Sequence, residues 1–351
     1  MNKNIAVLGG DGVGPEVTNE AIKVLKKIGE KFSHSFAFTE GKIGAIAIDA
    51  TGDPFPPETQ RLCESSDAVL FGAIGDPKYD NDPKATVRPE QGLLRMRKVL
   101  GLYANVRPIY TFDIAQSKSP LKPEITKDVD FVVIRELTGG IYFGEKGRTD
   151  NGRKAFDTCT YTIEEITQVA TLAFDLAKKR NKKLTLVDKA NVLETSRLWR
   201  ETVQQMATTY PDITVDYMFV DNASMQLMKN PRNFDIILTD NMFGDILTDE
   251  ASVISGSLGM LPSASIGGQV SVFEPIHGSF PKAAGQNTAN PTGTILSAAM
   301  MLDYSFALPK ESEAIFSAVK QVLTQGFGTK DIVEQNPLST SAFGDKIVDL
   351  L

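Results

Sequence analysis

The chain has 351 residues, 42% of them hydrophobic and 23% charged, and its formal net charge is −7 at pH 7. This length and composition are typical of a globular protein with room for two domains. The negative charge and the lack of a basic stripe exclude nucleic acid as the main partner. No apolar stretch of the sequence reaches membrane-spanning length.

The cysteine content indicates a reducing compartment. Only Cys63 and Cys159 are present, and they have neither metal-site spacing nor a disulfide framework. The sequence begins with a strand pattern and not with a secretory leader. We therefore expect a cytoplasmic protein.

The first predicted elements are a strand at residues 5–8, a glycine-rich turn at residues 9–16 and a helix at residues 17–28. Pro15 suits the first turn of that helix. The turn could indicate a dinucleotide-binding Rossmann unit. However, its sequence, GGDGVG, lacks the GxGxxG spacing, and a lone glycine-rich turn is a weak signal.

Hydrophobic periodicity and turn residues set the remaining elements. Residues 162–180 form a clear amphipathic helix, which Thr162 can cap together with Glu165 three positions later. The Pro- and Gly-rich stretches at 53–57 and 262–268 are expected to be surface loops. The other predicted elements are a strand at residues 67–72, a polar loop at 75–90, and helices at 92–100, 197–208 and 315–323.

Four short apolar runs in the chain each lead to charged residues. Runs of this length and type are typical of strands buried on both faces of a parallel sheet. Ligands of open α/β sheets bind at the carboxyl ends of such strands, so the pattern collects two cations and three carboxylates at one edge. Each charge alone could be an ordinary surface charge at a strand end. The runs are residues 131–134 before Arg135, 184–187 before Asp188 and Lys189, 217–220 before Asp221, and 235–238, which lead to Asp245 and Asp249.

Asp245 and Asp249 are four residues apart at the expected start of a helix after Gly244. At this spacing two carboxylates share one helix face and repel by roughly 0.2–0.5 kcal/mol in water. The helix N-terminus eases this repulsion, and a shared cation would ease it more. With Asp221 they predict a site for a hard ion, Mg²⁺ or Mn²⁺. The alternative is a helix-capping pair and an unrelated aspartate.

Histidine is nearly absent from the chain, which contains only His34 and His277. This scarcity largely excludes a Ser-His-Asp triad or a histidine-bound zinc ion. The remaining acid–base candidates are Lys189 and Tyr142, and both can serve when their pKa is lowered.

Three arginines, Arg97, Arg107 and Arg135, could bind carboxylates through their guanidinium forks. Beside a metal site, they indicate a substrate with more than one carboxylate. Each arginine taken alone is more simply explained by a surface salt bridge.

Seven motifs cover essentially the whole chain: residues 9–16 (GGDGVGPE), 88–94 (RPEQGLL), 135–144 (RELTGGIYFG), 188–193 (DKANVL), 241–247 (NMFGDIL), 273–279 (FEPIHGS) and 289–291 (ANP). Together they are highly specific. The chain resembles the isocitrate/isopropylmalate family of β-decarboxylating dehydrogenases. Within that family it is most similar to the members that act on 3-isopropylmalate in leucine biosynthesis.

The resemblance implies two α/β domains that share one continuous mixed sheet, and not a Rossmann fold. The coenzyme-side domain would combine residues 1–101 and 255–351. Residues 102–254 would form a dimerisation and metal- and substrate-binding domain, with an arm at about 145–160 that crosses to a partner. The family is homodimeric, and residues matching Lys189 and Asp221 enter the active site from the neighbouring subunit.

The reaction implied by the resemblance is oxidation of a 2-hydroxy acid at C2, followed by loss of its β-carboxylate as CO₂. We expect 3-isopropylmalate as the substrate, with D-malate, tartrate, homoisocitrate or isocitrate as alternatives. The roles implied by the resemblance are proton transfer by Tyr142 and Lys189, metal binding by Asp221, Asp245 and Asp249, and substrate binding by Arg97, Arg107, Arg135, Asp221, Leu93, Leu94 and Val192.

The expected coenzyme is NAD. In NAD-using relatives an aspartate usually stands where this chain has Lys282, and a lysine there resembles the NADP-using isocitrate enzymes. Ala283 and Glu334 depart from the NADP pattern, whereas Lys330 could assist a 2′-phosphate, so NADP stays open. The coenzyme contacts implied by the resemblance are Glu90, His277, Gly278, Ser279, Lys282, Ala284, Gly285 and Asn290.

Overall fold

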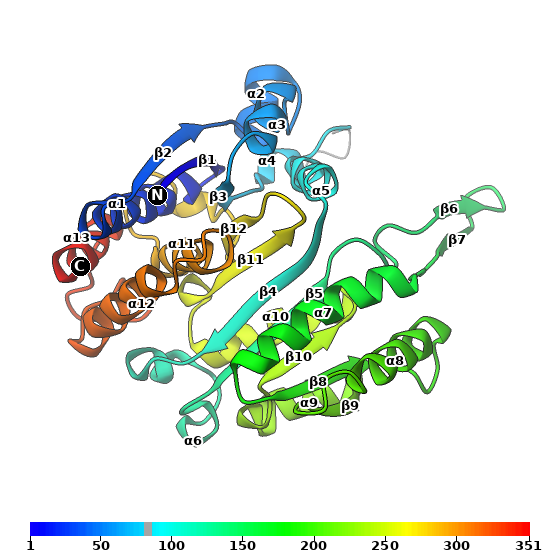
Figure 1. The fold of residues 1–351 in the computed structure, drawn as a ribbon. Helices are drawn as coiled ribbons and strands as arrows, with labels where there is room; N and C mark the ends of the chain where they lie inside the picture. Colours follow the sequence, from blue (N-terminus) through cyan, green and yellow to red (C-terminus); the bar gives the residue numbers. More distant parts are fainter. Residues whose placement is uncertain (81–85) are drawn as a thin grey trace. The chain divides into compact units, whose positions relative to one another are not determined.

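The computed structural model of the chain describes residues 1–80 and 86–351, so residues 81–85 of the predicted polar loop lie outside the described part. The chain divides into two compact units (Figure 1). Unit 1 consists of Met1–Leu102, Phe112–Ser119 and Ser255–Leu351, and unit 2 consists of Tyr103–Thr111 and Pro120–Ile254. The segment Phe112–Ser119 therefore groups with unit 1, although the resemblance placed it in the central domain.

Unit 1 contains a mixed sheet in which β1 pairs in parallel with β2 and β3, β3 pairs in parallel with β12, and β11 is antiparallel to β12. Every residue of β3 is buried, as expected for a central apolar strand. The strands, in spatial order, are β2 (Ser35–Glu40), β1 (Asn2–Gly10), β3 (Ala68–Ala73), β12 (Val272–Pro275) and β11 (Pro262–Gly267).

Helices α1 and α11 form the helical core of unit 1. The helix α1 is amphipathic and packs on β1 and β3, while α11 is buried along nearly its whole length and packs on β11 and β12. Figure 1 shows these helices beside the strands that they cover. The helices of the unit are α1 (Gly14–Phe32), α2 (Ala45–Thr51), α3 (Pro57–Glu64), α4 (Pro77–Asp80), α5 (Pro89–Val99), α11 (Thr292–Tyr304), α12 (Pro309–Thr324) and α13 (Thr340–Leu350).

Three loop expectations in unit 1 are wrong at least in part. Within the predicted surface loop at 53–57, the residues Pro54, Phe55 and Pro56 are buried, and within the predicted polar loop at 75–90, Pro77–Asp80 form the helix α4. Residues 262–268 were expected to be a surface loop, but Pro262–Gly267 form β11, and its first four residues are buried. Pro262 is tolerated because it is the first residue of the strand. Buried serines find partners: the Ser263 amide donates to Ser297 Oγ at 3.2 Å, and Ser265 Oγ donates to Glu274 at 3.5 Å. Small polar residues in a buried strand mislead a reading based on composition.

The strands of unit 2 also pair in both directions. The strands β5, β10, β8 and β9 are parallel, and β4 is antiparallel to β5. In spatial order they are β4 (Leu102–Tyr110), β5 (Asp130–Glu136), β10 (Ile236–Thr239), β8 (Lys183–Asp188) and β9 (Thr214–Phe219). The helices are α6 (Pro123–Thr126), α7 (Ile163–Lys179), α8 (Glu194–Ala207), α9 (Val220–Lys229) and α10 (Asn241–Ser252). The expected α/β class with one large mixed sheet is confirmed.

Three of the four apolar runs are confirmed as strands buried on both faces, namely β5, β8 and β10. The remaining run, at residues 217–220, is not a strand buried on both faces. It forms β9, which is the outer strand next to β8 and is exposed or only partly buried throughout. This run stops at Phe219, because Val220 already begins α9. An edge strand can be as apolar as a central one, so hydrophobicity alone did not separate the two.

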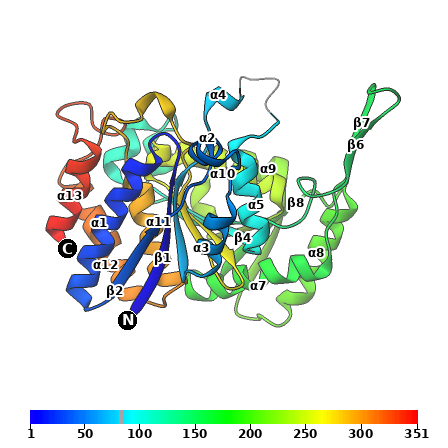
Figure 2. The same cartoon turned by 90° about the horizontal axis from the view of Figure 1, so that it is seen from above.

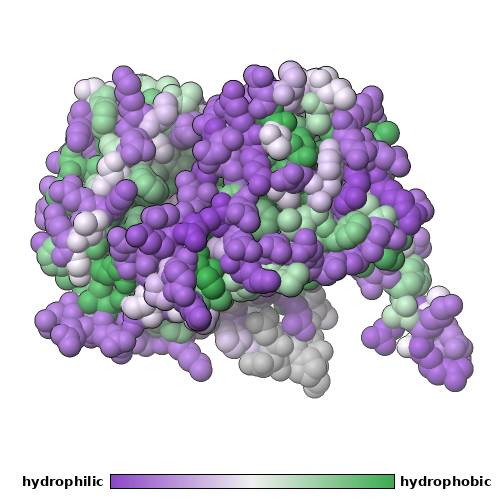
Figure 3. Space-filling view, turned by 90° about the horizontal axis from the view of Figure 1, so that it is seen from below, coloured by the Kyte–Doolittle hydropathy of each residue, from purple (hydrophilic) through white to green (hydrophobic). Residues whose placement is uncertain are grey.

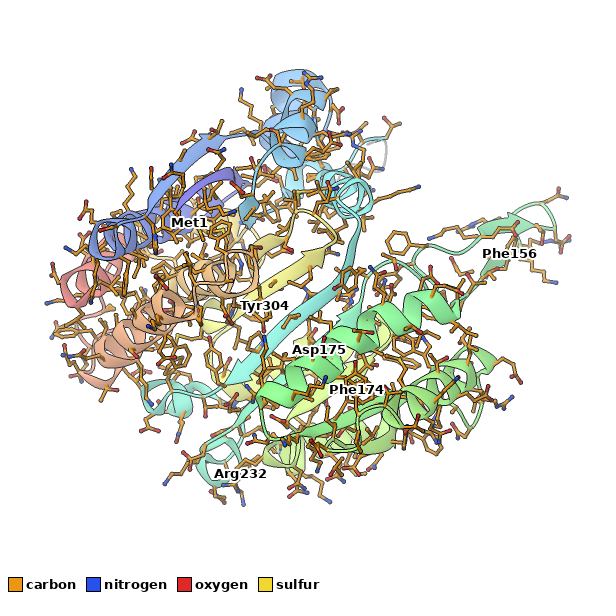
Figure 4. All side chains as sticks on the ribbon, in the orientation of Figure 1. Met1, Phe156, Phe174, Asp175, Arg232 and Tyr304 are labelled. Carbon is orange, nitrogen blue, oxygen red and sulfur yellow. The ribbon has the colours of Figure 1, made fainter. Side chains whose placement is uncertain are left out.

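The helix α7 forms as its sequence predicts. Thr162 caps it: the Glu165 amide donates to Thr162 Oγ1 at 3.2 Å, and the Thr162 amide donates to Glu165 Oε2 at 2.8 Å. Its two faces differ, as the neighbours Phe174 and Asp175 show (Figure 4). Phe174 is fully buried and stacks on Tyr210 with the ring centroids 4.3 Å apart, whereas Asp175 is exposed.

A two-stranded antiparallel hairpin, β6 (Lys146–Thr149) and β7 (Lys154–Asp157), projects from unit 2 (Figures 1 and 2). Its residues are almost all exposed, including Phe156, which Figure 4 labels on this hairpin. In the space-filling view the tip is hydrophilic and some hydrophobic surface lies near its base (Figure 3). The hairpin occupies the segment expected to be an arm.

Short 3₁₀ helices lie at Asp113–Lys118, Pro231–Asn233, Val253–Ser255, Leu258–Met260 and Pro281–Ala283. Within the described residues, none of the helices combines the length and the apolar character that crossing a bilayer requires.

Candidate active site

Arg135 is the most deeply buried charged group of the candidate site. It stands near the end of β5, and its side chain is only 4% exposed. The guanidinium donates to Asn241 Oδ1 from Nη2 at 2.8 Å and from Nε at 3.2 Å, and Nη1 donates to Asp245. A buried guanidinium needs such partners, because leaving its positive charge uncompensated is costly.

Gly244 allows this arrangement. A Cβ atom at position 244 would lie 2.5 Å from Arg135 Cγ and 2.7 Å from Arg135 Cβ, which is far below a van der Waals contact. The aliphatic part of Arg135 therefore lies directly against the backbone of α10. Only glycine at this position lets the strand end and the helix approach closely enough for Arg135 to reach Asp245.

The helix α10 begins earlier than expected. It starts at Asn241 and not after Gly244, and Asp240 caps it by accepting a hydrogen bond from the Phe243 amide at 2.7 Å. Asp245 consequently lies beyond the first turn, and Asp249 lies near the end of the helix. The favourable helix N-terminus is used by Asp240, so it does not offset the repulsion between Asp245 and Asp249. Burial, the largest cause, raises the pKa of Asp240 to about 7, and the negative charges of Glu136 and Asp188 add to this effect.

Arg107 lies on β4, and its side chain is 11% exposed. Its Nε donates to Asn105 Oδ1 at 2.6 Å, and its Nη1 donates to Thr248 Oγ1 at 2.8 Å. Nη1 also lies 3.4 Å from Asp249 Oδ1. Unit 2 thus places Arg107 and Arg135 on the two ends of one acidic helix face, with Asp249 beside the first and Asp245 beside the second.

Tyr142 joins the same cluster. Its hydroxyl donates to Asp245 Oδ2 at 2.9 Å, and its ring lies 5.8 Å from the Arg135 guanidinium carbon. The sequence argument expected a lowered pKa for this acid–base candidate. Instead, burial and the hydrogen bond to Asp245 raise the pKa of Tyr142 above its usual value. A phenol that retains its proton suits a proton donor and does not suit a base.

Lys189 follows β8 and lies 2.5 Å from Asp221 in the same chain. The residue before it, Asp188, is buried and accepts two hydrogen bonds of 2.8 Å from Arg200. This bidentate pair fixes the end of β8, so Asp188 has a structural role next to Lys189. The carboxylate of Asp221, paired with the Lys189 ammonium, has its pKa lowered by that hydrogen bond.

The three predicted metal ligands do not meet within one chain. Among residues 1–80 and 86–351, no group of three or more His, Cys, Asp or Glu side chains is arranged to hold a metal ion. Asp245 and Asp249 share a face of α10. Asp221 lies on another helix, α9, and pairs with Lys189. Their chemistry fits the expected ion, because all the donors are carboxylate oxygens and Asp245 and Asp249 have side chains 39% and 74% exposed.

Several functional side chains of unit 2 were missed by sequence reasoning. The side chain of Asn241 accepts hydrogen bonds from Arg135, and the backbone amide of Asn241 donates to the Tyr161 hydroxyl at 3.0 Å. Tyr161 in turn fills the space beside Gly139 and Gly140, where a Cβ on Gly140 would lie 2.3 Å from the Tyr161 oxygen. The paired glycines in the motif RELTGGIYFG were a signal of such close approach, but nothing in the sequence named the aromatic partner.

Unit 1 holds Arg97, Leu93 and Leu94 on α5. Arg97 Nη2 lies 3.8 Å from Glu274 Oε1, and Arg97 Nε is buried without a hydrogen-bond partner among the residues that the structure describes. An orphaned guanidinium N–H is suited to an incoming carboxylate. Leu94 is 45% exposed, and Val192 in unit 2 is 61% exposed, so both apolar side chains are accessible on the surface of their units.

The predicted coenzyme residues all belong to unit 1, and two of them, Glu90 and Ser279, lie close to Gly75. Gly75 lies beside both Glu90 and Ser279, since a Cβ on Gly75 would be 3.0 Å from Glu90 Oε1 and 3.6 Å from Ser279 Oγ. His277 Nδ1 lies 2.9 Å from the Gly278 carbonyl oxygen, while its Nε2 is buried and has no hydrogen-bond partner within residues 1–80 and 86–351. Burial lowers the pKa of His277, so the ring is neutral and Nε2 can accept a hydrogen bond. This orphaned acceptor fits a ligand with an N–H donor.

The remaining predicted coenzyme contacts differ in whether their side chains are free to bind a ligand. The side chain of Asn290 is buried and donates to Asp331 Oδ2 at 2.9 Å, while its Oδ1 accepts from the Thr292 amide at 3.0 Å. Lys282, Ala284 and Gly285 lie in an exposed loop.

The comparisons with known proteins agree with the fold. Residues 4–347 match the family model described as isocitrate/isopropylmalate dehydrogenase. The chain belongs to this family, which confirms the resemblance seen in its motifs. The family is one of dehydrogenases that act on small molecules with a nucleotide cofactor and a divalent metal.

Individual relatives are similar over nearly their full length. The chain is 57% identical over 335 residues to a 3-isopropylmalate dehydrogenase from Geobacillus kaustophilus, covering 94% of this chain and 90% of that protein. It is 53% identical to a 3-isopropylmalate dehydrogenase from Bacteroides fragilis, covering 100% and 99%. Among solved structures, an isocitrate dehydrogenase from Methylococcus capsulatus matches with a TM-score of 0.88 and 32% identity, covering 99% of both chains.

Proposed function

We propose that the chain catalyses the oxidative decarboxylation of (2R,3S)-3-isopropylmalate to 4-methyl-2-oxopentanoate and CO₂, with reduction of NAD, in leucine biosynthesis. The observation that carries this proposal is the cluster of Arg135, Tyr142 and Asp245 in a chain of this family. It combines a buried carboxylate-binding cation, a protonated phenol and a metal-type carboxylate within a few ångströms. A protein that only bound anions would need no phenol there.

The arginines are proposed to bind and orient the diacid substrate. Arg135 and Arg107 are largely buried and held by Asn241, Asn105 and Thr248, so their forks are fixed before a ligand arrives. A substrate carboxylate that approached them would compete with Asp245 and Asp249 for the same guanidinium N–H groups. Arg97 Nε, which is buried and has no partner in the described part of the chain, offers a further donor in unit 1.

Two proton transfers complete the proposed role of the chain. Lys189 would accept the proton of the C2 hydroxyl, directly or by relay, and Tyr142 would deliver a proton to C3 after CO₂ has left. Because one proton is taken from the substrate and one is returned to it, the reaction needs no net acid or base. The raised pKa of Tyr142 supports its role as the donor.

Asp245 and Asp249, together with Asp221 from a second copy of the chain, would hold Mg²⁺ or Mn²⁺. Glu90, His277, Gly278, Ser279, Lys282, Ala284, Gly285 and Asn290 would line the coenzyme site. The chemistry these groups supply when bound is hydride acceptance by the nicotinamide and offset of negative charge on the C2 oxygen by the ion.

A homodimer with shared active sites is part of the proposal. Asp221 and Lys189 stand together, apart from the cluster around Asp245, and the exposed hairpin β6–β7 offers strands and an exposed Phe156 to a second chain. The free cysteines Cys63 and Cys159 fit a reducing, cytoplasmic location.

The coenzyme preference is proposed to be NAD. Glu334, which would repel a 2′-phosphate, is ion-paired with Lys118 at 2.5 Å. A comparison of kcat/KM for NAD and NADP, on wild type and Lys282→Asp, tests this choice. A wild type that prefers NADP would contradict it.

The substrate is tested with purified protein, Mg²⁺ and NAD on 3-isopropylmalate, D-malate, tartrate, isocitrate and homoisocitrate. We expect the highest kcat/KM on 3-isopropylmalate. A higher value on any of the other four would replace the proposed substrate. A methyl-sized difference in an apolar pocket is worth only about 1–3 kcal/mol. D-malate, which lacks the whole isopropyl group, is therefore the comparison that tests the apolar pocket.

A further inference from the structure

The glycine-rich segment at residues 9–16 is conspicuous in the sequence, but none of its residues has a part in the proposed chemistry. In the structure it joins β1 to α1 and contacts several loops of unit 1. Its two carboxylates, Asp11 and Glu16, each bind backbone N–H groups of a different loop. A carboxylate that accepts backbone N–H bonds fixes a loop without dictating the side chains on it.

Asp11 holds the loop that carries Gly75. The side chain of this buried residue accepts hydrogen bonds from the amides of Ala45 at 2.9 Å, Ile46 at 3.0 Å and Gly75 at 2.9 Å. Gly75 lies beside Glu90 and Ser279, two of the proposed coenzyme residues. Asp11 thus fixes the backbone of Gly75, next to Glu90 and Ser279 in the proposed coenzyme site.

Gly12 and Val13 hold Ser279 itself. The Val13 amide donates to the Ser279 carbonyl oxygen at 2.8 Å. Gly12 has φ +59°, and a Cβ there would lie 1.9 Å from the same oxygen. The close approach therefore requires glycine at position 12.

Glu16 holds the loop at residues 285–287. Its Oε1 accepts from the Gly285 amide, and its Oε2 accepts from the Asn287 amide at 3.0 Å. Both residues have positive φ: Gly285, at +74°, adopts it without strain, whereas Asn287, at +55°, is in a conformation that costs energy for a non-glycine residue. The segment is also linked to α13, because the Thr340 amide donates to the Asn287 carbonyl at 3.0 Å.

We propose that Glu16 is a positioning residue for the coenzyme, acting through the backbone of Gly285 and Asn287. This inference rests on the proposed function, because it takes Ala284 and Gly285 as coenzyme contacts. With both carboxylate oxygens engaged, the loop is held in its binding conformation before the coenzyme arrives. Without Glu16, part of the binding free energy is spent on ordering the loop.

The test uses the purified full-length protein and two variants, Glu16→Ala and Glu16→Gln. Glutamine keeps one oxygen acceptor, so it should retain part of the effect. We expect the Kd for NADH, measured by NADH fluorescence, to rise about tenfold in Glu16→Ala and less in Glu16→Gln. The KM for NAD should rise in parallel, while kcat at saturating NAD and the KM for 3-isopropylmalate stay within about twofold of wild type.

The matched control is Glu30→Ala, which removes an exposed glutamate from the far end of the same helix. It should leave NADH binding unchanged. A Glu16→Ala protein with wild-type NADH binding would overturn the inference, and so would one in which the KM values for both substrates and the melting temperature changed together. A wild type that oxidises none of the five diacids would instead refute the proposed function.

Discussion

Asp240 offers a quantitative test of the electrostatics at the carboxyl end of β10. We consider the substitution Asp240→Asn, which keeps the shape of the side chain. Asparagine is as good an N-cap as aspartate, so it should preserve the hydrogen bond from the Phe243 amide. What the substitution removes is a carboxyl whose pKa is raised by burial to about 7 from 3.8.

The sign follows from linkage. A carboxyl with a raised pKa in the folded state contributes full stability below its unfolded pKa, near 4, and loses that contribution as the pH rises through 7. The neutral asparagine has no such dependence. Between pH 5 and pH 8 the variant should therefore gain stability relative to wild type. With the full pKa shift, the difference in the free energy of unfolding between variant and wild type would change by about 2.6 kcal/mol over this pH interval. Because Asp240 is only partly buried, we expect about 1–2 kcal/mol.

The assay is thermal and urea unfolding of both proteins at pH 5 and pH 8 in the presence of EDTA. Comparing variant with wild type at each pH cancels the titration of all other groups. The control is Asp175→Asn, which removes an exposed ion pair with Lys178 on α7 and should change little at either pH. If Asp240→Asn were destabilising at both pH values by the same amount, the assigned pKa and its cause would be wrong.

Three further outcomes are expected. Lys189→Ala and Tyr142→Phe should lower kcat by at least about 10²-fold with little change in melting temperature, and wild-type turnover in both variants would remove their proton-transfer roles. Chelation with EDTA should abolish turnover, which added Mg²⁺ or Mn²⁺ restores; full activity in EDTA would exclude the metal site. Replacing residues 146–157 by a short glycine linker should give an inactive monomer in sedimentation analysis, whereas an active dimer would show that the hairpin is dispensable.

The parts of the fold that could be predicted from the sequence are those governed by local pattern. The buried strand β5, which ends in Arg135, follows from an apolar run, and α7 follows from its periodicity and the Thr162 cap. The surface-loop prediction for 262–268 failed because serines in β11 satisfy their hydrogen bonds with distant partners. Such long-range pairing leaves no trace in a short window of sequence.

The candidate site was predictable to the level of residue types and not to the level of contacts. The scarcity of histidine and the spacing of Asp245 and Asp249 pointed away from imidazole chemistry toward carboxylates and arginines, and the roles of these side chains stay predictions. The start of α10 was misplaced because Gly244 was read as a helix boundary. In fact this glycine is required within the helix by the neighbouring Arg135, a reason that depends on tertiary structure.

The lack of a side chain at Gly244 also couples the positions of two charged groups, Arg135 and Asp245. Since Arg135 lies against the bare backbone of α10, and Asp245 extends from the next residue of that helix, any displacement of α10 would carry the cation and the anion along together. An ion that drew Asp245 toward itself would pull on the guanidinium through the same contact, so metal capture and carboxylate recognition would be mechanically linked.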